Sequence, residues 1–519
     1  MSEADIAMRP QRAPGETAAL PDGDTLTNLR EPRVVGTDGT LSALARWAFS
    51  FPAMLAIGLV ARVFYEARGF FVDPDFWWHV KVGQDILATH HLPTTDSYSF
   101  TVNGHPWIAY EWLGDLAFGA VARWGGLYGL AVMLIVLSCV VVLTLYAYAT
   151  MRSGNSKAGF VAAGLLCSLA FASFSMRPQM FGYLFLILVL IALERFHQRK
   201  TRALWFLPLL FLVWVNVHGS FIIGLGALFA HLVAGLKGFR VGAIEARPWT
   251  PAERIQLELV FLLSLAVLPL TPYGAQLAVY PFDMAWSQPL NVSHILEWQP
   301  MPFNIAGGKL FLGVVLGLFL AQMALRLTWR LAEVVLLFVG ILMACLHVRF
   351  LLVFVPFFAP LFGTVLARWL PAYQPKKDRF VLNAILITAA VAAMVHYFPT
   401  HKDIQKIVAR DYPVDGLKYL RTHSVPRPMF NTYGFGGYLV YAHQKVFLDG
   451  RGDLYERGGV LSDYLTASLL KPGALSVLDR YQIQSCMLAR GEPLAVVLDA
   501  SPQWKRLYID NVSEIFVRR

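Results

Sequence analysis

Membrane-length apolar runs constrain this chain more than any other feature of its sequence. A transmembrane helix needs about 20 largely apolar residues, and about eleven runs of this length or slightly shorter follow one another. Charged residues make up only 15% of the 519 residues, against roughly 25% in soluble domains. The sequence therefore predicts a polytopic α-helical membrane protein with about eleven spans, within a range of roughly ten to twelve. The runs are 44–64, 128–150, 158–175, 179–193, 203–217, 219–236, 255–271, 309–325, 330–346, 350–367 and 379–397.

Basic residues in the loops predict how the chain is oriented. Lys and Arg gather in alternate loops, such as 195–202 and 237–254, whereas the intervening loops hold little beyond Arg177 and Arg349. The positive-inside rule puts the basic loops in the cytoplasm and the intervening loops outside. The formal charge of +10 then reflects topology and contact with anionic membrane lipids, and we expect no nucleic-acid partner.

Three parts follow from this orientation. Residues 1–43 are rich in Pro, Gly, Thr and acidic residues without a signal peptide, which predicts a disordered cytoplasmic tail. Residues 44–397 form the membrane body, interrupted by a long first external loop at 65–127 and a second external excursion at 273–308. Residues 398–519 have the texture of a small extracytoplasmic α/β domain. The four cysteines show neither a disulfide framework nor zinc spacing.

The expected elements of the external domain come from alternating apolar residues and Gly-rich turns. The predicted strands are Met429–Asn431, Gly437–Ala442, Lys445–Leu448 and Ile483–Leu488, the predicted helices are Val460–Leu470 and Leu494–Ala500, and a hairpin joins Trp504–Ile509 to Glu514–Val517. Glycine turns explain the stretches 431–437 and 449–453, and no Lys-Ser/Thr follows that would make a phosphate-binding loop.

Two carboxylates follow the first apolar run, in the segment Val72-Asp73-Pro74-Asp75-Phe76-Trp77-Trp78-His79. A carboxylate at membrane depth costs about 2.5–3.5 kcal/mol or more, so ionisable residues there are functional candidates. Asp73 has an ordinary explanation as an N-cap, because Pro is favoured at the first helical position. Asp75 is then free for chemistry: it could deprotonate a hydroxyl, bind a divalent ion or only favour the helix dipole.

The segment after Asp73 is expected to form a helix along the membrane surface, from Pro74 to about Thr89. Asp75 and His79 would share one face at i and i+4. The face expected to contact lipid comprises Phe76, Trp77, Val80 and Leu87.

Other polar residues gather at the predicted outer ends of the apolar runs. Glu111 lies between aromatic residues, either as a second carboxylate of the same site or as one exposed acid in an aromatic belt. Arg177 and Arg349 suit phosphate oxygens, because Arg makes bidentate contacts that Lys cannot. Each residue alone could be structural, but their shared face favours one site. Its candidate substrate-binding residues are His79, Arg177, His218, Glu297, His347 and Arg349.

This layout resembles the GT-C superfamily of polytopic glycosyltransferases. It is most similar to bacterial protein-mannosyltransferase and aminoarabinose-transferase types, and more distantly to oligosaccharyltransferase catalytic subunits. The matching features are Asp73-Pro74-Asp75 after the first helix, the interfacial helix, a Pro-Thr-Thr-Asp segment at Pro93–Asp96 and an external C-terminal domain. Better-known members carry adjacent Asp-Glu or an Asp-x-Asp at this place. This chain has Asp-Pro-Asp followed by Phe-Trp-Trp-His, a variant pattern that resembles an uncharacterised bacterial branch.

The resemblance implies transfer of a sugar from a polyprenyl-phosphate donor to a lipid, glycan or protein acceptor outside the bacterial cytoplasmic membrane. Asp75 would deprotonate the acceptor hydroxyl, with Asp73 and Glu111 as the other catalytic candidates. The leaving phosphate would be stabilised by Arg349, Arg177, His347 or His218. A divalent cation, Mg²⁺ or Mn²⁺, on Asp73, Asp75 and Glu111 stays open, although relatives of the mannosyltransferase type generally work without one.

Two alternatives remain at this stage. A transporter or flippase for lipid-linked glycans predicts ionisable residues near the bilayer midplane and paired broken helices, a pattern that the outer-face placement disfavours. A non-catalytic scaffold that binds polyprenyl lipids predicts that Asp75→Asn leaves function intact.

Overall fold

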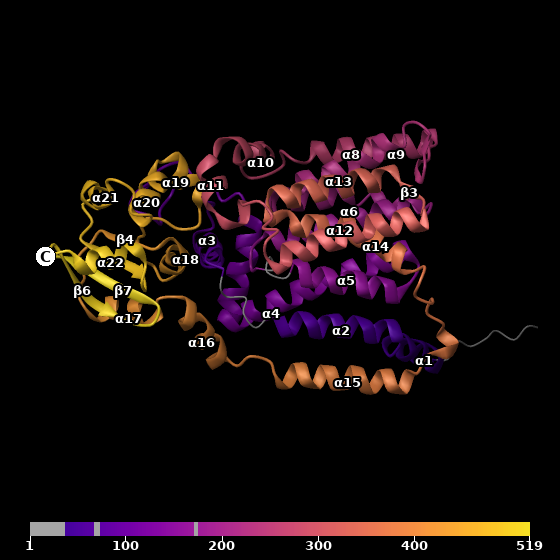
Figure 1. The fold of residues 1–519 in the computed structure, drawn as a ribbon, viewed down its shortest axis with the longest axis horizontal. Coiled ribbons are helices and arrows are strands. Elements are labelled where there is room, and N and C mark those ends of the chain that lie inside the picture. The colour runs from indigo at the N-terminus through magenta and orange to yellow at the C-terminus, as the bar shows by residue number, and fades with distance from the viewer. Residues whose placement is uncertain (1–36, 67–72, 171–174) are drawn as a thin grey trace, which may run out of the picture. The chain divides into compact units, whose positions relative to one another are not determined.

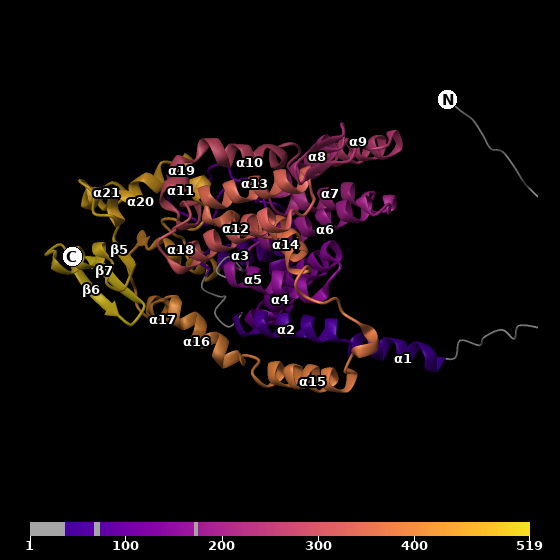
Figure 2. The same ribbon diagram turned by 45° about the vertical axis from the view of Figure 1, so that its right-hand side comes forward.

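The structure is a computed structural model that describes residues 37–66, 73–170 and 175–519. Its contacts divide the chain after Ala48 into two units, which are described separately. The first unit contains α1 (Thr37–Ala48), so a helix begins inside the segment predicted as a disordered tail. The rest of that segment, residues 1–36, lies outside the described residues. The second unit, from Phe49 to Arg519, holds all the other elements (Figures 1 and 2).

Each predicted apolar run overlaps a helix, although the run at 255–271 extends beyond the helix and residues 171–174 of the run at 158–175 lie outside the described residues. Four helices are long and apolar enough to cross a membrane, or up to six if each of two bent pairs is one span. These helices make the chain a helical membrane protein, while the count of about eleven spans stays a prediction. The helices that match the runs are α2 (Phe51–Glu66), α4 (Trp112–Ser153), α5 (Ser156–Ala170), α6 (Gln179–His197), α7 (Leu207–Val217), α8 (Phe221–Ala234), α9 (Pro251–Ala266), α12 (Ala306–Leu325), α13 (Leu331–Leu346), α14 (Leu351–Leu366) and α15 (Phe380–His396).

The central helix of the body is α4, whose buried face recurs at helical spacing and packs against α5, α6 and α14. Ion pairs of Arg152 join its far end to neighbouring helices. Arg152 Nε lies 2.6 Å from Glu333 Oε1 and 3.9 Å from Glu194 Oε2, and Glu194 also pairs with Arg330. Figure 1 places β3, which contains Arg330, at the end of the helical body opposite α3. The small sheet there has the order β1-β2-β3 (Phe239–Val241, Ile244–Ala246, Trp329–Arg330).

The predicted first external loop is more helical than expected. It contains α3 (Asp75–Thr89), as predicted, but α4 begins at Trp112 and not near residue 128. Gly126 has φ 56° and ψ −150° and kinks α4 where the apolar run was expected to start. Glycine adopts this backbone conformation without the steric penalty that a side chain would bring. The second excursion is also largely helical, with α10 (Gln276–Ser287), α11 (Pro289–His294) and η4 (Leu296–Trp298), and η5 (Val348–Phe350) precedes α14.

The expectation that α3 presents an apolar face to lipid is wrong. Phe76, Trp77 and Val80 are each at most 1% exposed. The Trp77 ring makes edge contacts with Tyr412 and Tyr438, at centroid distances of 5.2 and 4.9 Å. Residues after the last helix of the membrane body therefore cover the face that was expected to meet lipid.

The C-terminal part is built on a four-stranded sheet of order β4-β5-β7-β6 (Met429–Asn431, Ser485–Ala489, Ser513–Arg518, Trp504–Ile509). β4 pairs with β5 in parallel, and the other two pairs are antiparallel. The predicted strand at 483–488, the closing hairpin and both predicted helices are confirmed. The helices are α16 (His401–Asp411), α17 (Val414–Thr422), α18 (Tyr433–Tyr441), α19 (Gly452–Arg457), α20 (Val460–Ser468), α21 (Ala474–Arg480) and α22 (Pro493–Ala500).

Two predicted strands are wrong. Most of Gly437–Ala442 belongs to helix α18, and Lys445–Leu448 forms only an isolated bridge from Val446 to Ser99. A Cβ at Gly437 would lie 2.2 Å from the backbone oxygen of Pro74. Glycine therefore lets α18 pack directly on the start of α3, and this tertiary contact overrides the strand tendency of the local residues.

Candidate active site

Arg177 is held by three carboxylates just before α6. Its Nε lies 2.5 Å from Asp73 Oδ2, its Nη2 lies 3.1 Å from Asp75 Oδ2, and Glu297 approaches both terminal nitrogens at 3.0 Å. We call these four residues the Arg177 cluster. Asp73 also accepts the backbone N–H of Asp75 at 3.0 Å, so it serves the helix start, as its ordinary explanation predicts, and binds the arginine as well. Three negative charges surround one positive charge here.

Asp75 is the least satisfied member of the Arg177 cluster. Its Oδ1 is buried without a hydrogen bond of ordinary geometry. Burial raises the pKa of Asp75 from 3.8 to about 7, since the attraction of Arg177 is opposed by Asp73 and Glu297. A carboxyl group with a pKa near neutrality can both accept and release a proton under physiological conditions.

A second group of ionisable residues surrounds Glu111, immediately before α4. Its Oε2 lies 3.5 Å from His79 Nε2, and its Oε1 lies 3.3 Å from His218 Nε2. His79 Nδ1 lies 2.6 Å from Asp115 Oδ1. We call these four residues the Glu111 cluster. Although Asp75 and His79 belong to one helix, they contact different partners, so the predicted acid–imidazole pair within α3 does not form.

Both histidines of the Glu111 cluster are neutral near pH 7. Burial, with added repulsion from arginines, lowers the pKa of His218 to about 3 and that of His79 well below its usual value. The backbone N–H of Ser220 donates to His218 Nδ1 at 3.0 Å, so the ring proton is on Nε2, facing Glu111. Burial raises the pKa of Glu111 to about 8, against the attraction of Arg177 and Arg349. Glu111 therefore keeps its proton at neutral pH.

Arg349 and His347 both contact Trp298, next to the Arg177 cluster. The Arg349 guanidinium carbon lies 4.2 Å from the Trp298 ring centroid, and His347 Nδ1 lies 2.5 Å from the Trp298 backbone oxygen. None of the described carboxylates forms an ion pair with Arg349, whereas Arg177 has three such partners. Of the two candidate arginines, Arg349 is therefore the one whose positive charge is available to bind an added anion.

The carboxylates do not fit the divalent cation that the sequence left open. The Arg177 guanidinium lies between Asp73, Asp75 and Glu297 and holds the oxygens that a metal ion would need. Within residues 37–66, 73–170 and 175–519, no group of three or more His, Cys, Asp or Glu side chains is placed to hold a metal ion.

The C-terminal part supplies one wall of this site. The loop 449–451, just before α19, runs past the Arg177 cluster, where a Cβ at Gly450 would lie 1.6 Å from Asp75 Oδ1. The loop is fixed by Arg451, which is fully buried and binds Asp449 through two nitrogens and Asp96 through the third, at 2.7–2.9 Å. We call Asp96, Asp449, Arg451 and Tyr455, whose hydroxyl also contacts Arg451, the Arg451 cluster.

Sequence reasoning missed two buried acids. Asp115 binds His79 from inside α4, and its signal was an acid within a helix that is apolar over most of its length. Asp453 follows Arg451, its Oδ1 has no hydrogen-bond partner, and burial raises its pKa to about 6. The Arg-Gly-Asp string that contains Arg451 and Asp453 looks like a coincidence in the sequence. Only long-range contacts reveal its place beside the site.

No protein-family model and no curated protein matches this chain. Among solved structures, the apo form of ArnT from Cupriavidus metallidurans aligns at 13% identity with a TM-score of 0.50, covering 92% of this chain and 98% of that one. The same protein bound to undecaprenyl phosphate gives 13% identity and a TM-score of 0.48 over 89% and 97% of the two chains. The Archaeoglobus fulgidus oligosaccharyltransferase gives 12% identity and a TM-score of 0.48 over 84% and 68%.

The likeness to apo ArnT extends over nearly the full length of both chains. Together with the apolar helices, it shows that the chain has the fold of the GT-C superfamily of membrane glycosyltransferases. The recognition made from Asp73-Pro74-Asp75 and the layout of the apolar runs is confirmed at the level of the fold. The reaction is argued from the site itself, because one fold can carry many activities.

Proposed function

We propose that this protein transfers a sugar from a polyprenyl-phosphate donor to an acceptor hydroxyl on the extracytoplasmic face of the membrane. The observation that carries the proposal is the state of Asp75. This largely buried carboxylate has a pKa of about 7; Arg177 holds one of its oxygens, and the other lies near the Trp78 indole without a hydrogen bond of ordinary geometry. Burial and a surplus of negative charge are the usual means by which enzymes bring an acid to neutrality for proton transfer.

The reaction follows from two neighbouring groups. The acceptor hydroxyl gives its proton to Asp75 as its oxygen attacks the anomeric carbon of the sugar. The bond between that carbon and the donor phosphate oxygen breaks, and polyprenyl phosphate leaves with one more negative charge. Arg349, which has no carboxylate partner among the described residues, is suited to bind that charge.

The remaining residues position and tune these groups. Arg177 holds Asp75 through Oδ2, and the acceptor must displace the backbone of Gly450 to reach Oδ1. Glu111 is protonated at neutral pH, so it adds no further negative charge that would oppose the phosphate. Proton transfer by a positioned base contributes about 10²–10⁴-fold. Positioning and stabilisation of the phosphate must supply most of the acceleration.

The test is transfer of radiolabelled sugar from polyprenyl-phosphate donors by purified protein in lipid. Asp75→Asn should lower transfer by about 10²–10⁴-fold while donor binding persists, because the base is lost and the amide keeps the shape. Asp411→Asn removes a partly exposed acid that pairs with exposed Arg410 and serves as the matched control, with transfer unchanged. Unchanged transfer in Asp75→Asn would move the base to Glu111 or Asp73. Donor binding without transfer in the wild type would favour the scaffold or the flippase.

A further inference from the structure

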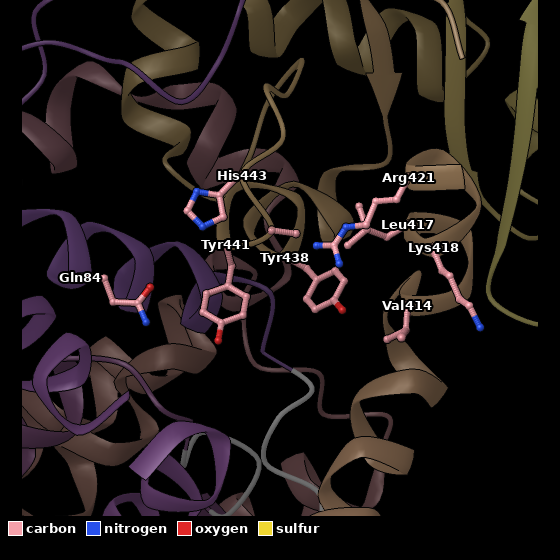
Figure 3. Close-up of a pocket in the computed structure, with 9 residues that line it drawn as sticks. Gln84, Val414, Leu417, Lys418, Arg421, Tyr438, Tyr441 and His443 are labelled. Carbon is pink, nitrogen blue, oxygen red and sulfur yellow. The ribbon is translucent and has the colours of Figure 1, made fainter. Parts of the chain in front are cut away.

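A pocket of about 550 Å³ opens between α3 and two helices of the C-terminal part, α17 and α18. Figure 3 shows its polar side chains, with Gln84 on one side, Lys418 on the other and the Tyr438 ring beside Arg421. The pocket shares no residue with the Arg177 or Glu111 clusters. The polar residues that line it are Gln84, Lys418, Arg421, Tyr438, Tyr441 and His443, and we call it the basic–aromatic pocket.

The charge of this pocket is positive. Lys418, Arg421 and His443 line it, and no Asp or Glu does. Arg421 and Lys418 form no ion pair or side-chain hydrogen bond among the described residues. Asp415 acts on Tyr438 from α17, but its side chain is not part of the lining. An anion is therefore the ligand that these groups favour.

The neutral groups of the pocket are also without partners. Neither the Gln84 amide nor the hydroxyls of Tyr438 and Tyr441 form a hydrogen bond within the described residues, so both donors and acceptors are available. The two tyrosine rings are fixed from behind by Trp77, at centroid distances of 4.9 and 5.1 Å. Tyr438 also stacks on Tyr412 at 5.3 Å. The rings are thus held in place before any ligand arrives, which lowers the entropic cost of binding.

We propose that the basic–aromatic pocket binds an anionic saccharide, meaning a sugar that bears a phosphate or a carboxylate. Arg421 would bind the acid group, because a guanidinium matches the geometry of both anions. The tyrosine faces suit the C–H face of a sugar ring, and the amide and phenol groups suit its hydroxyls. The volume lies within the range of small-molecule sites, roughly 300–1,000 Å³. This inference stands independently of the transfer proposed for Asp75.

The test is calorimetric titration of the full-length protein in phosphatidylcholine nanodiscs. The probes are glucose 1-phosphate, glucuronate, glucose and inorganic phosphate. We expect saturable binding of glucose 1-phosphate or glucuronate, at least about tenfold tighter than glucose or phosphate alone, because the sugar and acid contacts add. The tighter of the two anions identifies the acid group of the ligand.

Three variants separate the pocket from non-specific attraction. Arg421→Gln should weaken binding at least about tenfold. Tyr438→Ala should weaken binding too. The control is Lys471→Gln, which removes one exposed charge elsewhere in the C-terminal part and should leave binding unchanged. Arg421 is exposed, so its variant is expected to fold even if Tyr438→Ala does not. Equal affinity in wild type and Arg421→Gln would overturn the proposal, as would phosphate binding as tightly as glucose 1-phosphate. Absence of binding by both anions would overturn it as well.

Discussion

Arg177 and Arg451 are both surrounded by carboxylates, yet the two clusters differ in their exposure and in the carboxylate oxygens that lack a hydrogen-bond partner. Arg451 and its partners Asp96 and Asp449 have fully buried side chains, and both oxygens of Asp449 receive its N–H groups. In the Arg177 cluster, Arg177 and Asp75 are each 16% exposed, Glu297 is 36% exposed, and one oxygen of Asp75 has no partner. The first cluster is closed, and the second retains unused hydrogen-bonding capacity.

The electrostatic consequence is opposite for the two acids. Although burial alone would raise it, the pKa of Asp96 is lowered by Arg451 and by hydrogen bonds from Ser99. The pKa of Asp75 is raised, because burial and neighbouring carboxylates outweigh Arg177. A buried arginine therefore does not by itself set the direction in which the pKa of a neighbouring carboxyl group shifts. The number of carboxylates for each cation and the oxygens left unpaired do so.

The largest effect is expected from removing Arg451. Arg451→Met should lower the free energy of unfolding by about 3–5 kcal/mol, since two buried carboxylates lose their only cation. Thermal unfolding of the protein in lipid measures the loss. Arg410→Met, which removes an exposed ion pair, should cost at most about 1 kcal/mol. Similar losses in the two variants would contradict the structural role of the Arg451 cluster.

Gly450→Ala should damage the site more than the fold. The added Cβ would overlap Asp75 Oδ1, so the carboxylate must move, and a displacement of about 1 Å can cost roughly 10²-fold in rate. Sugar transfer measures the effect. Gly434→Ala is the matched control, because a Cβ there meets nothing within 4 Å. Normal transfer by Gly450→Ala would show that the function of Asp75 does not depend on its contact with the C-terminal loop.

Neutralising one acid in each cluster should change stability in opposite directions. Asp96→Asn should destabilise the fold by about 1–3 kcal/mol, because buried Arg451 loses a charged partner. Asp75→Asn should leave stability unchanged or raise it, since the surplus charge around Arg177 falls. Thermal unfolding at pH 7 compares them. Equal destabilisation by both substitutions would remove the distinction between the clusters.

The raised pKa of Asp75 also predicts a pH dependence of stability. The pKa of Asp75 is raised from 3.8 to about 7 on folding, so the folded state holds the proton more tightly. Its contribution to stability is present below about pH 4, declines as the pH rises to about 7 and is constant above that. Unfolding temperatures of wild type and Asp75→Asn should therefore diverge between these limits, with the wild type losing stability. Parallel curves would show that Asp75 has its ordinary pKa.

The sequence predicts local features well and long-range contacts poorly. The apolar runs and the helix after Asp73 depend on composition and periodicity, which act over a few turns. The extent of α4 was missed because Asp115 and Gly126 interrupt its apolar pattern. The orientation of α3 depends on Trp77 meeting Tyr412 and Tyr438.

The same limit applies to the site. The sequence identifies the Arg177 cluster and, apart from Asp115, the Glu111 cluster, because ionisable side chains at membrane helix ends are unusual. It cannot show that Arg451 binds Asp96, or that Gly450 covers Asp75. These contacts join the segment between α2 and α4 to the loop before α19, and no local pattern specifies such pairings.

The contact of Gly450 with Asp75 also fixes an order of assembly. During synthesis, α3 is made long before the loop 449–451, so Asp75 lacks its backbone cover until that loop has been made. The site can be completed only after that loop has been made and has packed against α3. A chain that stops after the membrane helices would carry the acid but would not enclose it.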